Sequence, residues 1–177
     1  MNPGFRFALL VAALAAGSAS AQQRVGMTLI DQKGVGASIG TIEIAAAPKG
    51  GGVIFTPMLK GLPPGEHGFH VHEFANCGAK EKDGKLAAGE AAGNHYDPKK
   101  THKHEGPAGG GHMGDLPPLK VDAQGNATQS VTAPRLALKD LRRKALVIHE
   151  GGDNLADQPK PNGGGGTRIA CGVVGEK

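Results

Sequence analysis

The segment HGFHVHE, residues 67–73, carries two histidines one residue apart, His70 and His72. Successive side chains of a β-strand point to opposite faces, so these two imidazoles share one face of a predicted strand. Phe69 and Val71 alternate with them and are predicted to face a hydrophobic core. Two imidazoles on one side of a rigid strand form half of a metal site, so the rest of the chain must supply the other half.

The composition favours β-structure. The 177 residues include 30 glycines and five phenylalanines, but no tryptophan and only one tyrosine. Such a chain builds its core from aliphatic side chains and makes many tight turns. Apolar alternation and turn signals predict strands at 24–30, 38–45, 53–56, around His70, at 119–121 and 127–131 as a hairpin, and at 145–149 and 168–174. The predicted fold is an all-β antiparallel sandwich or barrel of about eight strands.

Two long segments interrupt this pattern. Residues 73–115 and 150–167 are polar and rich in glycine. Loops of this length in a compact domain are usually functional or disordered, and the histidines in and beside them favour function. Residues 136–144 are predicted to form either one short helix or a loop, and the four glycines 163–166 lack the order of a phosphate-binding motif.

The N-terminus has the features of a secretory signal peptide, residues 1–21. Arg6 precedes an apolar run, and the small residues 19–21 match the A-x-A pattern that predicts cleavage before Gln22. The run is short for a membrane-spanning helix, although a retained anchor is the alternative. We therefore expect residues 22–177 to form one domain that is exported to the periplasm without stable membrane insertion.

The charge of the chain argues against a nucleic-acid partner. The formal net charge is +4 at pH 7, and no Lys/Arg tract is interleaved with aromatic residues. A modest positive field favours a small anionic substrate.

Only two cysteines are present, Cys77 and Cys171. In an exported protein they favour one disulfide that closes a long loop, and two buried free thiols are the alternative. Two cysteines so far apart exclude a four-cysteine zinc site and a zinc finger within this chain.

The number of candidate metal ligands indicates two sites. Seven side chains can donate to a metal: His70, His72, His95, His104, His112, His149 and Asp115. One tetrahedral metal uses four ligands; an all-imidazole set suits copper, and three imidazoles with a carboxylate suit zinc. His95 lies between the two groups in sequence and is the candidate bridge, because imidazole has two ring nitrogens. His102 is the alternative to His104, and His67 is predicted to be structural, hydrogen-bonded to the backbone.

These residues lie in a series of motifs. In order, the chain contains HGFHVHE, NHYDP, HEGP, HMGDLPPL, APRL, VIHEGGDN and GGGGTRIACGVV. Over nearly all of the chain after residue 21, it resembles the copper,zinc superoxide dismutases of the bacterial exported type. The resemblance implies a Greek-key β-sandwich with a dinuclear centre. It implies the copper ligands His70, His72, His95 and His149 and the zinc ligands His95, His104, His112 and Asp115.

The same resemblance implies roles for residues around the metals. Asp153 matches a carboxylate that hydrogen-bonds a ligand of each metal, and Arg168 matches the arginine that receives the anion. Cys77 and Cys171 match the disulfide that pins the first long loop to the last strand. The implied reaction converts superoxide to dioxygen and hydrogen peroxide as copper alternates between two oxidation states, with His95 carrying a proton to the product.

Several alternatives stay open from the sequence. Lys80, Lys82 and Lys85 either steer superoxide or belong to an ordinary solvated loop. An envelope protein that buffers copper and zinc without turnover, or a non-catalytic module of the same fold, would use some of the same ligands. Both a monomer and a homodimer are compatible with the sequence.

Overall fold

A computed structural model of the chain describes residues 22–175. The predicted signal peptide, residues 1–21, lies outside these residues. No helix in the described part of the chain is long and apolar enough to cross a membrane.

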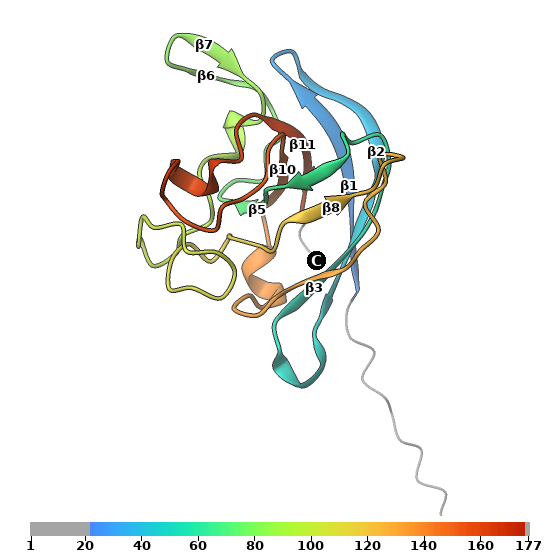
Figure 1. Cartoon of the computed structure of the whole chain (residues 1–177), viewed down its shortest axis with the longest axis vertical. Helices are drawn as coiled ribbons and strands as arrows, with labels where there is room; N and C mark the ends of the chain where they lie inside the picture. The colour runs from blue at the N-terminus through green and yellow to red at the C-terminus, as the bar shows by residue number, and fades with distance from the viewer. Residues whose placement is uncertain (1–21, 176–177) are drawn as a thin grey trace, which may run out of the picture.

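The regular secondary structure of the described residues consists of strands and 3-10 turns joined by loops (Figure 1). The strands are β1 Gln23–Asp31, β2 Gly34–Ala46, β3 Val53–Leu59, β4 Gly65–His67, β5 Phe69–His72, β6 Lys80–Lys82, β7 Lys85–Ala87, β8 Leu119–Val121, β9 Val131–Ala133, β10 Ala145–His149 and β11 Arg168–Val173. The 3-10 helices are η1 Pro48–Gly50, η2 Glu90–Ala92, η3 Leu138–Leu141 and η4 Pro161–Gly164.

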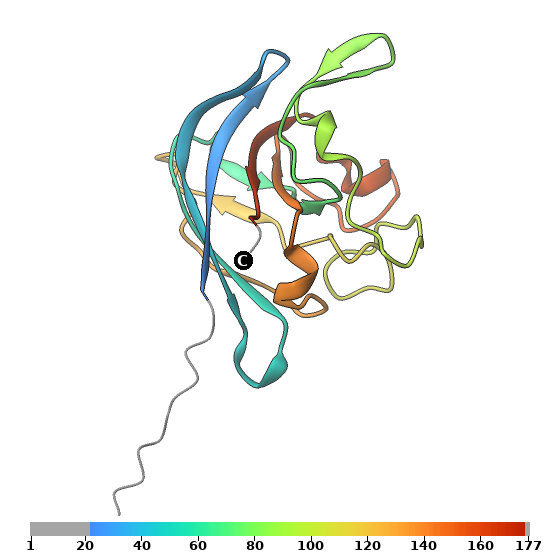
Figure 2. The same ribbon diagram turned by 180° about the vertical axis from the view of Figure 1, so that it is seen from behind.

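Seven strands form one curled antiparallel sheet in the order β5–β10–β11–β1–β2–β3–β9. β4 pairs with β8, and β6 with β7. The last strand, β11, lies beside the first, β1, and β9 lies beside β3. Long connections therefore join strands that are not neighbours in the sheet, as in a Greek key. The two opposite views in Figures 1 and 2 show the sheet wrapped around the interior, with the long loops gathered on one side. The predicted all-β antiparallel fold is confirmed.

The predicted hairpin between 119–121 and 127–131 is wrong. The turn itself forms, since Asp122 N donates to Asn126 O over 2.9 Å. Its two arms then diverge: β8 pairs with β4, whereas Ala127 pairs with Leu59 at the end of β3. One arm belongs to the separate two-stranded β4–β8 sheet and the other makes an isolated bridge to β3, because a turn signal reports only the local reversal of the chain.

Other differences are extensions and additions. β2 and β3 run further than predicted, and β3 continues through Pro57 to Leu59. The long segment 73–115 contains the small β6–β7 hairpin, which the sequence pattern did not indicate. Within 136–144 the only helical element is the 3-10 turn η3.

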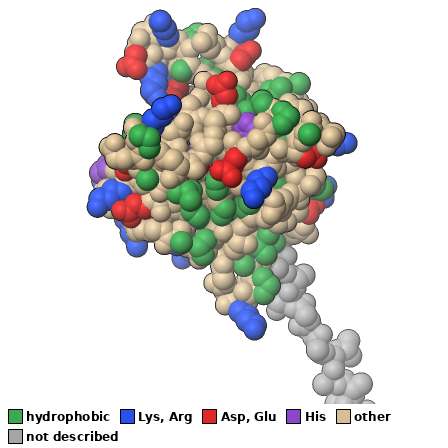
Figure 3. All heavy atoms as spheres, viewed as in Figure 1, with side chains coloured by type: hydrophobic (Ala, Val, Ile, Leu, Met, Phe, Trp, Pro, Cys, Tyr) green, Lys and Arg blue, Asp and Glu red, His purple; other side chains and the backbone are tan. Residues whose placement is uncertain are grey.

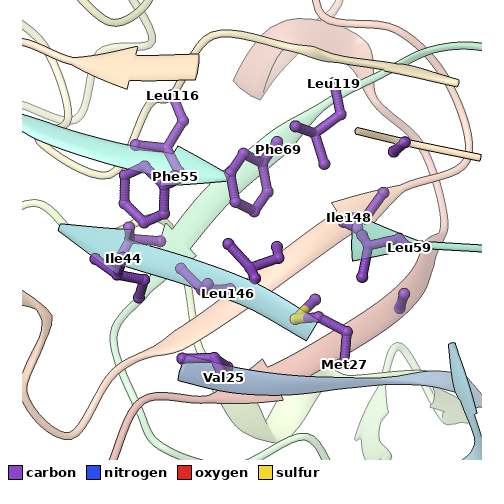
Figure 4. Close-up of a cluster of buried hydrophobic side chains, with 14 of the residues drawn as sticks. Val25, Met27, Ile44, Phe55, Leu59, Phe69, Leu116, Leu119, Leu146 and Ile148 are labelled. Carbon is purple, nitrogen blue, oxygen red and sulfur yellow. The ribbon is translucent and has the colours of Figure 1, made fainter. Parts of the chain in front are cut away.

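The hydrophobic core lies inside the barrel (Figure 4). Phe69 and Val71 of β5 are fully buried in it, as predicted from strand alternation. The rings of Phe55 and Phe69 meet edge to face with centroids 5.6 Å apart, a favourable aromatic geometry. Leu146 and Ile148 of β10 complete this side of the core, so β5 and β10 present their alternate side chains to the outside.

A second, smaller cluster covers the outside of the barrel. Val147 of β10 packs there with Ile30, Ala92 and the cystine. Cys77 and Cys171 form the predicted disulfide and join residues separated by 94 positions. The loop that begins at residue 73 is therefore fastened to β11, directly above the strands that carry the histidines.

Candidate metal centre

β5 and β10 place three imidazoles on the outer face of the barrel. In their antiparallel register Val147 lies opposite His70 and Ala145 opposite His72. His149 N donates to Gly68 O over 2.8 Å, so His149 lies opposite Gly68. Gly68 is two residues before His70, and His149 therefore shares the face of His70. All three histidines are buried beneath the long loops.

The loop 73–115 returns to β5 and brings further ligands beside it. His72 forms a β-bridge with His95, and His70 forms one with Asp115. Val71 anchors this arrangement, since its N–H donates to Gly114 O and its carbonyl accepts from Tyr96 N. The loop therefore behaves as an additional irregular strand, which explains how residues distant in sequence reach the histidine pair.

Two groups of four potential metal ligands result, and a smaller set of His70, His104 and Asp153 lies between them. Within each group, one ligand atom from every residue lies within 4.8 Å of the others. The first group consists of His70, His72, His95 and His149, and the second of His95, His104, His112 and Asp115. The structure thus brings together all seven predicted ligand residues, and His95 belongs to both groups.

Three of the four imidazoles of the first group, those on β5 and β10, are each oriented by a hydrogen bond from one nitrogen. His70 Nε2 donates to Asp153 over 2.6 Å, His72 Nδ1 to Gly93 O over 2.9 Å, and His149 Nδ1 to Gly166 O over 3.1 Å. The opposite nitrogens of these three rings are buried and have no hydrogen-bond partner among the described residues. Unpaired buried nitrogens are costly, and three that converge fit a metal with a preference for imidazole.

The protonation states favour metal binding at this group. Burial, followed by the neighbouring His95, lowers the pKa of His70 and of His72 well below the usual histidine value. Burial also lowers the pKa of His149 to about 4. The three rings are therefore neutral at physiological pH, and their free lone pairs point into one space.

In the second group, three histidine nitrogens lie at similar distances from one carboxylate oxygen. Asp115 Oδ1 lies 3.0 Å from His95 Nδ1, 3.1 Å from His104 Nδ1 and 3.3 Å from His112 Nδ1. A tetrahedral zinc ion with bonds of about 2.0–2.1 Å places its ligand atoms roughly 3.3 Å apart. The Nδ1 atoms of His104 and His112 are buried and, although close to Asp115, make no hydrogen bond of suitable geometry within the described residues. Both the spacing and the donor set fit zinc.

Asp153 connects the two groups. Its carboxylate accepts from His70 Nε2 over 2.6 Å and from His104 Nε2 over 2.8 Å. Burial by itself would raise the pKa of Asp153, but the hydrogen bonds from His104 and His70 outweigh it and hold the pKa well below the usual range. The ionised carboxylate therefore fixes which nitrogen of each ring remains available as a ligand.

Asp153→Asn is expected to weaken binding of both metals by about 10- to 100-fold, because an amide cannot accept from both rings as the carboxylate does. Chelator competition measures the two dissociation constants. Asp157→Asn is the matched control, since among residues 22–175 the Asp157 carboxylate accepts only from the backbone N–H groups of His104 and Asn162 and from no imidazole. Unchanged affinity for both metals in Asp153→Asn would show that this carboxylate does not orient the ligands.

Arg168 lies beside the first group. Its Nη1 donates to Gly89 O over 2.7 Å and its Nη2 to Gly93 O over 2.9 Å. The same Gly93 carbonyl accepts from His72, so one peptide group positions both the arginine and an imidazole. Arg168 also lines a hollow of about 170 Å³ together with His95 and His149. A cationic fork at the wall of such a hollow is suited to a small anion.

The glycine run 163–166 packs directly against the two groups. A Cβ on Gly163 would lie 2.3 Å from Asp153 Oδ1, and the φ of +75° at Gly163 also disfavours other residues. A Cβ on Gly165 would lie 2.9 Å from the Cβ of His149. These glycines are needed for close approach, a role that the sequence analysis did not assign to them.

Arg135, in the APRL motif, is a second residue whose role was missed. Its guanidinium donates to the carbonyls of Pro107 over 3.0 Å, Gly111 over 2.9 Å and Gly106 over 3.2 Å, and also to that of His112. Arg135 therefore holds the loop that carries the second group, including the backbone of one of its ligands. The loop is rich in small residues, which offer few side chains to pack against the rest of the fold. This composition was the available sign that another residue must hold the loop in place.

Arg135→Met is expected to weaken zinc binding by about tenfold or more, because each lost hydrogen bond to a charged donor is worth roughly 1.5–3 kcal/mol. Copper affinity should change little, since Arg135 does not touch the first group. Chelator competition at each metal, with the exposed Arg142→Met as control, measures this. An equal loss for the two metals would mean that Arg135 stabilises the whole fold.

The two remaining histidines lie outside both groups. His67 is buried, and its two nitrogens lie 2.7 Å from His149 O and 2.8 Å from Pro63 O, so the predicted backbone contacts are confirmed. His102 is exposed, and its backbone N donates to Asp97. His104, the preferred candidate of the two, is the one that lies in the second group.

Comparisons with known proteins agree with this architecture. Residues 38–174 match the family model of copper/zinc superoxide dismutase (SODC). The chain is 53% identical over 171 residues to "Superoxide dismutase [Cu-Zn]" of Escherichia coli strain K12, which covers 96% of this chain and 98% of the relative. The solved structure of the Brucella abortus Cu/Zn superoxide dismutase is 48% identical, with a TM-score of 0.84, covering 87% of this chain and 99% of that one.

A second solved structure, the monomeric copper, zinc superoxide dismutase from Salmonella enterica, is 59% identical with a TM-score of 0.77. It covers 87% of this chain and 99% of the other. The family match spans most of the chain, both ligand groups and Arg168. This chain belongs to the copper/zinc superoxide dismutase family.

Proposed function

We propose that this protein converts superoxide to dioxygen and hydrogen peroxide, with copper and zinc as its cofactors. The observation that carries the proposal is the set of convergent buried nitrogens, without hydrogen-bond partners in the described part of the chain, in two groups that share His95. Copper is assigned to His70, His72, His95 and His149, and zinc to His95, His104, His112 and Asp115. When bound, copper supplies one-electron redox chemistry and zinc supplies a fixed positive charge.

The residues around the metals bind the substrate and handle protons. Arg168 keeps its positive charge at working pH and attracts the superoxide anion into the hollow beside His149. His95 Nδ1 faces Asp115 at 3.0 Å, which leaves Nε2 as the atom that can hold a proton for the peroxide product. Asp153 keeps the ligand rings oriented while their nitrogens are engaged.

Among the lysines of the β6–β7 hairpin, Lys82 is our candidate for substrate guidance. It lines the hollow that contains Arg168, His95 and His149, whereas Lys80 and Lys85 do not. In Figure 3 positive and negative side chains lie close together on this projecting hairpin, so its net field is weak and the position of each charge matters.

We also propose where the protein acts. Residues 1–21 would be removed as a signal peptide, and the single domain 22–177 would work in the periplasm. The charged start, apolar run and small residues at 19–21 support this, as does the disulfide, which needs an oxidising compartment. The Salmonella enterica relative is described as monomeric, which supports a monomer for this chain over a homodimer.

The experiment that tests the function compares one preparation in two metal states. Protein loaded with copper and zinc is expected to dismutate superoxide, and protein loaded with zinc alone is not. Tight, stoichiometric copper binding without dismutation would contradict the proposal and favour a metal-buffering protein.

A further inference from the structure

We propose that Glu90 weakens anion binding in the hollow, because its carboxylate competes with the substrate for Arg168 and Lys82. This inference rests on the proposed function and concerns the same site. Glu90 begins the 3-10 turn η2, in the loop that the disulfide fastens to β11.

The geometry places one carboxylate oxygen between two cations. Glu90 Oε1 lies 3.4 Å from Arg168 Nη2 and 3.1 Å from Lys82 Nζ. The Glu90 side chain is 19% exposed and that of Arg168 only 10%, so water screens their contact incompletely. All three residues line the hollow that contains His95 and His149.

Glu90 is not needed to orient Arg168. The guanidinium already donates to the carbonyls of Gly89 and Gly93 from two different nitrogens. The carboxylate therefore adds a negative charge next to the group that receives the anion. It is not required to hold that group in place, because the backbone carbonyls already do so. An incoming anion must share Arg168 with this internal carboxylate or displace it.

The charge balance gives the size of the effect. With neutral imidazoles, Arg168 and Lys82 contribute two positive charges to the hollow and Glu90 removes one. A unit charge about 7 Å from a bound anion changes its affinity roughly threefold in the dielectric of water, which sets a lower bound where screening is incomplete. The effect should shrink as salt approaches about 0.1 M, where the screening length is about 10 Å.

Glu90→Gln in the copper- and zinc-loaded protein tests the inference. Azide is the probe, and its dissociation constant is read from the absorption of the copper–azide complex. We expect Glu90→Gln to bind azide about threefold more tightly and to react with superoxide about threefold faster at low ionic strength. Metal analysis of both proteins ensures equal loading.

Glu81→Gln is the matched control. It makes the same charge change in the neighbouring β6–β7 hairpin, but Glu81 is exposed and does not line the hollow. The inference predicts no comparable change in azide affinity for Glu81→Gln, and weaker azide binding for Lys82→Gln.

The outcomes separate this inference from the proposed function. Equal or weaker azide binding by Glu90→Gln would overturn the inference even if the parent protein dismutates superoxide. An equal gain in Glu81→Gln would also overturn it, because the effect would then be one of net charge. Absence of dismutation by the parent protein would overturn the proposed function, while the azide comparison would still report on Glu90.

Discussion

Replacing His149 with alanine is expected to lower superoxide dismutation by more than about 100-fold. This loss is larger than the roughly 10- to 100-fold typical when only a residue that hydrogen-bonds a metal ligand is removed. The substitution removes one of three buried nitrogens that converge without a hydrogen-bond partner. It also lies outside the second group, where His104, His112 and Asp115 remain. We therefore expect copper to be lost or weakly held and zinc to stay bound.

Two measurements follow the His149→Ala variant: dismutation at saturating metal, and the content of each metal after dialysis. His102→Ala is the matched control, because His102 is an exposed histidine outside both groups. It should retain both metals and full activity. Full activity in His149→Ala would contradict the assignment of this residue to the redox site.

Replacing Arg168 with alanine is expected to slow the reaction with superoxide roughly 10- to 100-fold while both metals stay bound. Arg168 contacts carbonyls and Glu90 rather than any group that would ligate a metal. Its removal takes away the buried positive charge of the hollow, so the remaining rate should also depend less on ionic strength.

Arg168→Lys separates the charge from the geometry. A lysine keeps the charge but cannot donate to Gly89 and Gly93 in the same fork, so we expect a partial recovery of rate. Rate constants at several salt concentrations and metal analysis provide the readouts. Loss of copper or zinc from Arg168→Ala would mean that the residue has a structural role.

Local geometry explains which parts of the fold were predictable. The two-residue period of a strand fixes the opposite faces of His70 and Val71 whatever surrounds them, and the structure agrees. The end of β10 at His149 was likewise predicted from its apolar run. By contrast, the partner of Leu119–Val121 depends on strands far away in sequence, and this pairing was predicted wrongly.

The candidate site shows the same division. Imidazoles, carboxylates and cysteines carry recognisable chemistry, so the ligands that the structure brings together were visible in the sequence. Arg135 and Glu90 act on partners that no local pattern identifies. Arg135 binds the carbonyl of His112, and Glu90 contacts the guanidinium of Arg168, which lies 78 positions further along the chain. Gly163 has no side chain, and its role follows only from what a Cβ would meet.

The central claim is that one chain holds a copper and a zinc ion in two groups joined by His95. Anomalous diffraction from crystals of the loaded protein, recorded at the copper and zinc absorption edges, tests it most directly. We expect one copper peak among His70, His72, His95 and His149 and one zinc peak among His95, His104, His112 and Asp115. A single metal peak, or the same element in both groups after loading with both metals, would contradict the account.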